Sequence, residues 1–126
     1  MSLIKQQKLV DLLLERTRKS KLEWQTTLAD NAFQISFRDN SVRLEQVETG
    51  GNEPDYVVSL INSEGNVVEN FSDVDLWQDQ KDLSESDRKN YYRALAELYA
   101  LARRTALGSD KVLNSILNEL DDEIPF

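Results

Sequence analysis

Four aspartates between residues 72 and 83 are the side chains best suited to chemistry. Asp73, Asp75, Asp79 and Asp82 offer the carboxylate oxygens that Ca²⁺ prefers. An EF-hand loop needs oxygen ligands at positions 1, 3 and 5, glycine at position 6 and glutamate at position 12. Counted from Asp73, position 5 is Trp77, position 6 is a glutamine and position 12 is a serine. We therefore expect no bound metal here, and interpret the stretch as a solvated acidic loop before a helix.

Trp77 is a large aromatic residue in the middle of this polar stretch. Because tryptophan side chains are usually largely buried, we expect it to plug the edge of the core. The alternative is an exposed Trp77 that serves as a binding hot spot. The candidate partner-binding residues are therefore Trp77, Asp73, Asp75 and Asp79.

The usual catalytic residue types are missing from the chain. It has no histidine and no cysteine, which removes the commonest general base, disulfides and thiolate metal sites. No phosphate-binding, dinucleotide-binding or nucleophile-elbow glycine motif is present. Tyr91, Tyr92 and Tyr99 could stack on a ligand, but at helical spacing we expect them to pack on a sheet with their hydroxyls reaching water. We expect no cofactor and favour a protein that is not an enzyme.

The charge is unevenly distributed along the chain. Residues 22–83 hold thirteen of the 23 Asp and Glu and only three of the 15 Lys and Arg. This acidic middle argues against a nucleic-acid partner, because phosphate contacts need Lys and Arg. It fits a basic protein partner, although acidic residues also simply keep small proteins soluble.

The basic residues have a local explanation. Arg16 and Arg18 lie near the end of one helical pattern, and Arg103 and Arg104 near the end of another, where the helix dipole favours positive charge. An anion site made of Arg43, Arg103 and Arg104 is the alternative to ion pairs with the acidic loops of the sheet. Nucleic-acid binding would need Arg16, Arg18, Lys19, Lys21, Arg103 and Arg104 to converge on one face.

The surrounding elements follow from hydrophobic periodicity, and the 126 residues suit a single domain. Residues 2–19 have helical spacing, with Ser2 able to cap them. From residue 22 to 71 the period is two, with turn residues at Asp39-Asn40 and between 62 and 65. Because the strands are too closely spaced for helical crossovers, we predict an antiparallel meander of four or five strands. Its continuous apolar run, 56–61, suggests a strand covered on both faces.

Two helices are expected after the acidic connector 72–83. One spans 84–107, with capping-box spacing at Ser84 and Asp87 and a stop at Gly108, and the other spans 110–121. The predicted fold is therefore α+β, over residues 1–126, with an N-terminal helix that either joins the long helix or shields a sheet edge. Apolar residues on the last helix exceed the needs of one narrow face, so a homodimer is also expected.

Three blocks of sequence resemble a group of small uncharacterised bacterial proteins. They are Lys21–Trp24 with Asn31–Phe37, then Asp55–Ile61 with Gly65 and Phe71–Leu76, then Leu98–Arg104 with Leu107-Gly108. The resemblance implies a bacterial origin and a stand-alone domain. It carries over no activity, cofactor or site residue.

Two classes of function remain open. The first is a non-enzymatic protein-interaction module, accessory, immunity or antitoxin-like, with an acidic binding surface. The alternative is a small-molecule-binding domain or minor enzyme with a pocket between sheet and helix. The first residues lack the apolar run of a signal peptide, and no stretch is long enough to span a membrane. We expect a cytoplasmic protein without a membrane partner.

Overall fold

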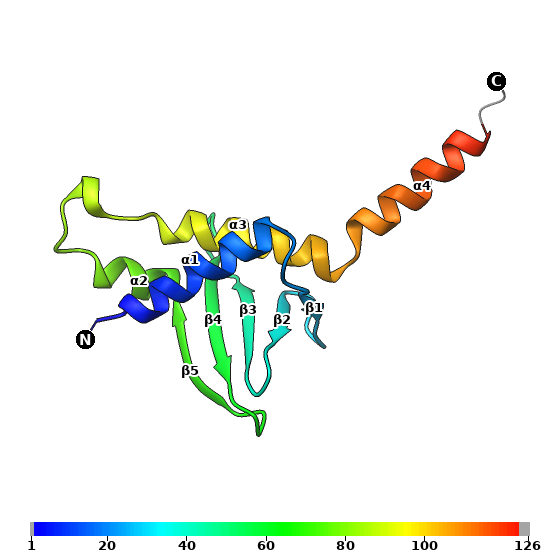
Figure 1. Cartoon of the computed structure of the whole chain (residues 1–126). Coiled ribbons are helices and arrows are strands. Elements are labelled where there is room, and N and C mark those ends of the chain that lie inside the picture. The colour runs from blue at the N-terminus through cyan, green and yellow to red at the C-terminus, as the bar shows by residue number, and fades with distance from the viewer. Residues whose placement is uncertain (1, 124–126) are drawn as a thin grey trace.

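A computed structural model describes residues 2–123 and has the predicted α+β architecture (Figure 1). In chain order the elements are α1 (Ile4–Arg18), β1 (Gln25–Thr26), β2 (Ala32–Ser36), β3 (Ser41–Val47), β4 (Asp55–Ile61), β5 (Val67–Ser72), α2 (Asp73–Asp79), the 3₁₀ helix η1 (Glu85–Asp87), α3 (Tyr91–Ala106) and α4 (Ser109–Glu123). No helix in this part of the chain is both long and apolar enough to cross a bilayer.

The five strands form one antiparallel sheet in the order of the chain, which confirms the predicted meander. Its hairpins close where the sequence places turn residues. The Phe37 N–H donates to the Asn40 carbonyl at 2.8 Å, and the Asn62 N–H donates to the Asn66 carbonyl at 2.9 Å. Gly65 takes a φ of +85° in the second turn, a conformation that residues with a Cβ rarely adopt.

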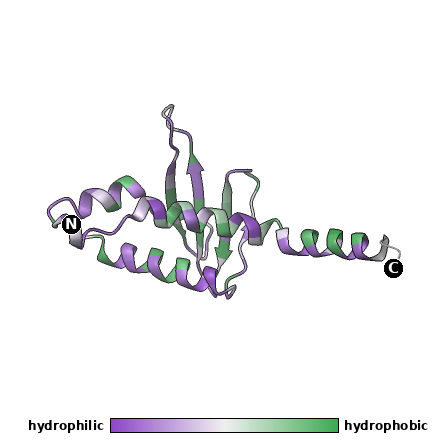
Figure 2. Ribbon diagram, turned by 90° about the horizontal axis from the view of Figure 1, so that it is seen from above, coloured by the Kyte–Doolittle hydropathy of each residue, from purple (hydrophilic) through white to green (hydrophobic). Residues whose placement is uncertain are grey.

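The helices α1 and α3 lie side by side over one face of the sheet (Figures 1 and 2). Of the two predicted positions for the N-terminal helix, the structure shows the first: α1 packs beside the long helix α3. Alternation along the strands points Phe33, Leu44 and Val58 toward the helices, and these side chains are almost completely buried. From α3, Leu95 and Leu98 meet them and are fully buried.

Some element boundaries differ from the predictions. Leu28 lies inside the stretch with a period of two but is fully exposed, because β1 covers only Gln25 and Thr26. β4 lies between two strands, and the helices cover the face that carries Tyr56 and Val58. On the other face, which the helices leave uncovered, Val57 is half-buried while Ser59 and Ile61 are buried, so the expected burial on both faces holds only in part. The first helix begins at Ile4, and its N-cap is Leu3 rather than Ser2.

The segment from residue 72 to 90 departs most from the predictions. The stretch expected to be irregular contains α2, and the long helix begins at Tyr91 rather than at residue 84. The Ser84 hydroxyl does donate to Asp87, at 2.8 Å, but only the short helix η1 forms at this pair. Asn90 is the true N-cap of α3, and its side chain accepts the Arg93 N–H at 2.9 Å.

The long helix ends where the sequence predicts. Arg103 and Arg104 occupy its last turn, and Gly108 follows with a φ of +67°. This left-handed glycine turns the chain into α4, which points away from the rest of the molecule (Figure 1).

Candidate functional site

The helix α2 carries most of the predicted site residues, and it forms because of its first turn. The Ser72 hydroxyl accepts the Asp75 N–H at 3.2 Å, and the Asp75 carboxylate accepts the Ser72 N–H at 2.9 Å. This is a capping box with aspartate in place of the usual Glu or Gln. Leu76, which has no exposed surface, then anchors the helix in the core.

Asp73 is a structural residue of the fold. Its side chain is 8% exposed and accepts the backbone N–H of Tyr56, in β4, at 2.9 Å. Burial raises the pKa of the Asp73 carboxyl; the Tyr56 N–H opposes this change, and the carboxylates of Asp55 and Asp75 add to it. A carboxylate held in this way has little surface left for a partner.

Asp79 joins α2 to the first helix. Its Oδ2 atom accepts the Leu3 N–H and the Gln7 side-chain N–H, both at 3.0 Å. The bond to Leu3 satisfies one of the backbone donors that every helix N-terminus leaves without an intrahelical partner. Asp73, Asp75 and Asp79 therefore have specific structural roles, which the interpretation as a solvated loop missed.

Trp77 is exposed, so the expectation that it plugs the core is wrong. Its side chain is 53% exposed because the neighbouring Leu76 takes the inward position on α2, and successive helix residues point about 100° apart. The Arg88 guanidinium lies 5.9 Å from the centre of the Trp77 ring, within the range of a cation–π contact. Arg88 is itself held by hydrogen bonds to the carbonyls of Gln80, at 3.3 Å, and Lys81, at 2.5 Å.

The exposed ring of Trp77 borders an open pocket of about 540 Å³. Val74, Tyr92 and Arg88 contribute to its walls, together with Glu53. Aromatic and arginine side chains of this kind are common at the centre of protein interfaces. We call this feature the Trp77 pocket.

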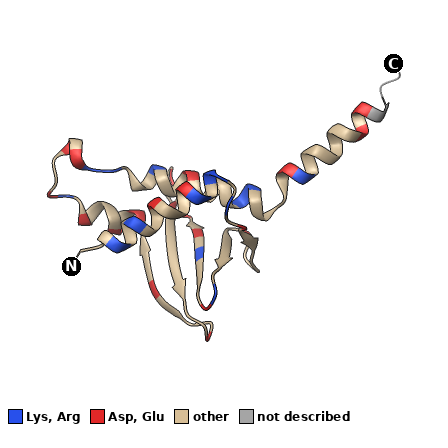
Figure 3. Ribbon diagram, in the orientation of Figure 1, with Lys and Arg blue, Asp and Glu red and all other residues tan. Residues whose placement is uncertain are grey.

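A second open pocket, of about 620 Å³, lies on the opposite side of α2, where α1 and β5 meet it. We call it the acidic groove. Leu3 and Phe71 give it an apolar part, and no Lys or Arg is among its lining residues. Four carboxylates line it: Glu69, Asp75, Asp79 and Asp82. Figure 3 shows acidic residues on α2, on β5 and in the segment that follows α2.

Sequence reasoning missed Glu69 as a member of this groove. The side chain is exposed and accepts the Gln6 side-chain N–H at 2.8 Å. The period of the strand predicts where Glu69 lies. It is two residues before the buried Phe71, so both side chains are on the same face of the sheet. Arg88 and the pocket beside Trp77 had no comparable signal in the sequence.

The tyrosines pack as predicted, with one difference. Tyr99 contacts Phe33 and Tyr56 with ring centroids 5.4 and 5.6 Å apart, and Tyr92 contacts Tyr56 at 5.6 Å. The Tyr91 hydroxyl was expected to reach water but donates to the Asp11 carboxylate at 3.2 Å. The rings of Tyr92 and Tyr99 therefore contribute to packing between α3 and the sheet.

The arginines do not form the anion site considered from the sequence. Arg43 lies on the sheet face opposite the helices, whereas Arg103 and Arg104 end α3. The partner of Arg104 is Asp110 of α4, at 2.5 Å, rather than a sheet loop.

Two of the other basic residues considered for nucleic-acid binding are also paired within the protein. Arg18 binds both carboxylate oxygens of Glu97 at 2.6 Å, and this lowers the pKa of Glu97. Lys19 binds Glu15 at 2.9 Å. These intramolecular pairs reduce the positive charge available to a phosphate backbone.

The surface beside α2 combines an open pocket with a groove lined by carboxylates. In the described residues no group of three or more acidic side chains is placed to hold a metal ion. What α2 offers is an exposed indole on one side and several carboxylates on the other. Comparison with models of known protein families, with curated proteins and with solved structures finds no match.

Proposed function

We propose that the protein is a non-enzymatic protein-interaction module that binds a basic segment of a partner protein along α2. The observation that carries the proposal is the acidic groove, which is lined by four carboxylates and by no Lys or Arg. A basic partner would gain charge complementarity there, and complementary charges also accelerate association.

The exposed Trp77 supports the same surface. Its indole is large and rigid, and the nearby Val74 is also exposed, at 46%. Tryptophan is among the residues that most often dominate binding energy at interfaces. A partner that reaches across α2 would meet apolar contact on one side and negative charge on the other.

The alternative of a small-molecule site between sheet and helix loses support. Leu44, Val58, Leu95 and Leu98 fill that interface and are fully buried. The Trp77 pocket and the acidic groove open at the surface beside α2 instead.

The test is affinity purification of partners from the native cell at low salt, followed by binding measurements on purified components. The groove variant combines Glu69→Gln with Asp82→Asn, because these two exposed acids have no part in capping α2. The control variant combines Asp30→Asn with Glu64→Gln, which removes the same charge from exposed sites outside the groove.

We expect the groove variant to bind about ten-fold more weakly, and Trp77→Ala about thirty-fold, with the control unchanged. Affinity of the unchanged protein should fall as salt is added. A partner that binds both double variants equally, or whose affinity ignores salt, would contradict the proposal.

A further inference from the structure

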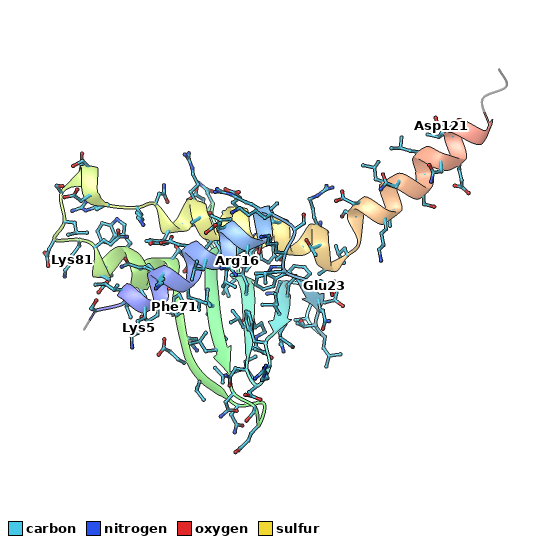
Figure 4. All side chains as sticks on the ribbon, viewed as in Figure 1. Lys5, Arg16, Glu23, Phe71, Lys81 and Asp121 are labelled. Carbon is cyan, nitrogen blue, oxygen red and sulfur yellow. The ribbon has the colours of Figure 1, made fainter. Side chains whose placement is uncertain are left out.

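The helix α4 exposes a continuous apolar stripe. Its members recur at helical spacing and each leaves about half of its surface exposed: Val112 (57%), Leu113 (50%), Ile116 (48%), Leu117 (47%) and Leu120 (51%). Green bands recur along α4 in Figure 2, and Figure 4 shows its side chains in open space with Asp121 near the far end. The helix packs mainly against the end of α3, so the stripe is left uncovered.

The stripe has the size of an interface. The exposed parts of its five side chains come to roughly 400 Å² in one copy, as large as the largest apolar patch on a typical monomer. With the whole stripe covered, two copies would bury up to about 800 Å² of apolar surface. Because interfaces are about 56–65% apolar, this corresponds to roughly 1,300 Å² in total, within the range of stable complexes.

The charges on α4 indicate which way a second copy would lie. Arg103, Arg104 and Lys111 are at the base of α4, whereas Glu119 and Asp121 are near its tip. Figure 3 shows charged residues toward both ends of α4 and none along its middle. An antiparallel pair places the acidic tip of each helix at the basic base of the other, while a parallel pair sets tip against tip.

The stripe is also self-complementary in the antiparallel direction. With the two-fold axis between Ile116 and Leu117, these residues face each other across the pair, and Leu113 faces Leu120. The same alignment places Asp121 opposite Val112 of the second copy, one residue from Lys111 and two from Asp110. Asp110 is already paired with Arg104, at 2.5 Å, which offsets the repulsion.

We propose that two copies of this chain associate through an antiparallel pairing of their α4 helices. Both copies then use the same surface, as a closed two-fold dimer requires. The interface is distinct from the α2 surface, so this inference does not depend on the proposed function.

The first test is the oligomeric state of the full chain, measured by sedimentation equilibrium. We expect a dimer, and expect Ile116→Asp to weaken it by at least about 100-fold, because the new carboxylate would be desolvated in an apolar interface. The matched control is Asn118→Asp, which adds the same charge to α4 on the side away from the stripe. Circular dichroism checks that both variants fold. A protein that stays monomeric, or a dimer that Ile116→Asp leaves unchanged, would overturn the proposal.

The second test determines the direction of pairing. The chain has no cysteine, so introduced thiols are unique. Under oxidation, a mixture of the Leu113→Cys and Leu120→Cys proteins should form the mixed disulfide, because an antiparallel pair places those two positions opposite each other. Efficient linking of Leu120→Cys to itself, without the mixed product, would show parallel pairing and overturn the proposed arrangement.

Discussion

The buried Asp73 carboxyl has two effects on stability: it accepts a hydrogen bond, and it places a charge in a buried position. Different substitutions of Asp73 separate these two effects. In Asp73→Ala the Tyr56 N–H loses the acceptor that lies 2.9 Å away, in a place where the aspartate is 8% exposed. A buried donor without a partner costs about 1–3 kcal/mol. We expect the free energy of unfolding to fall by about that amount.

Asp73→Asn keeps an oxygen for the Tyr56 N–H and removes the charge. Burial raises the pKa of Asp73 in the folded protein, so the ionised form is the less favourable one there. An increase of one unit in pKa corresponds to a destabilisation of the ionised form, relative to the protonated form, by about 1.4 kcal/mol. The Asn variant should therefore be at least as stable as the unchanged protein at neutral pH.

The pH dependence has a definite sign. A pKa that is higher in the folded than in the unfolded state gives stability that is full below the unfolded value and is lost as pH rises through the folded value. The advantage of Asp73→Asn over the unchanged protein should thus grow from about pH 4 to about pH 7.5. Urea unfolding at both pH values measures it, and other carboxyls largely cancel in the difference. Equal destabilisation by Asn and Ala, or an advantage that does not change with pH, would refute the reasoning.

Three further substitutions test the packing. Thr17→Val removes the acceptor of the Trp24 indole N–H, 3.0 Å away; chemical unfolding should show a loss of about 1–3 kcal/mol, and fluorescence in a Trp77→Phe background should report a changed Trp24 environment. Leu98→Ala creates a cavity at a fully buried position and should cost about 2–5 kcal/mol in urea unfolding. Gly108→Ala forces a residue with a Cβ to a φ of +67°; we expect faster amide hydrogen exchange at the junction of α3 and α4, and an unchanged rate there would contradict the role of this glycine.

The sheet could be predicted because its determinants are local. Alternation of apolar and polar residues identifies which side of each strand is buried, as Phe33, Ile35 and Leu44 show. The turns at Asp39-Asn40 and at Gly65 fix the pairing of neighbouring strands. Each strand pairs with the next one along the chain, so the pairing could be predicted without contacts between distant parts of the sequence.

The helix α2 could not be predicted from the same kind of signal. Ser72 with Asp75 and Ser84 with Asp87 have the same spacing and residue types, but a helix of two turns follows only the first pair. The difference is tertiary: Leu76 reaches the core after the first pair, whereas η1 contains no buried residue. Capping residues mark where a helix can start, and burial decides whether it forms.

Net charge alone does not show which acidic residues bind a partner, because some of them stabilise the fold. Asp73 and Asp79 accept backbone hydrogen bonds, and Asp75 caps α2, so part of the acidic excess belongs to the fold. Neutralising these three would change stability and binding together. Glu69 and Asp82 are exposed and take no part in the cap, so their charge can be removed more cleanly. If a partner responds to the field of the whole acidic segment, neutralising distant exposed acids should weaken binding as much as neutralising these two. If it sits in the groove, neutralising the distant acids should leave binding unchanged.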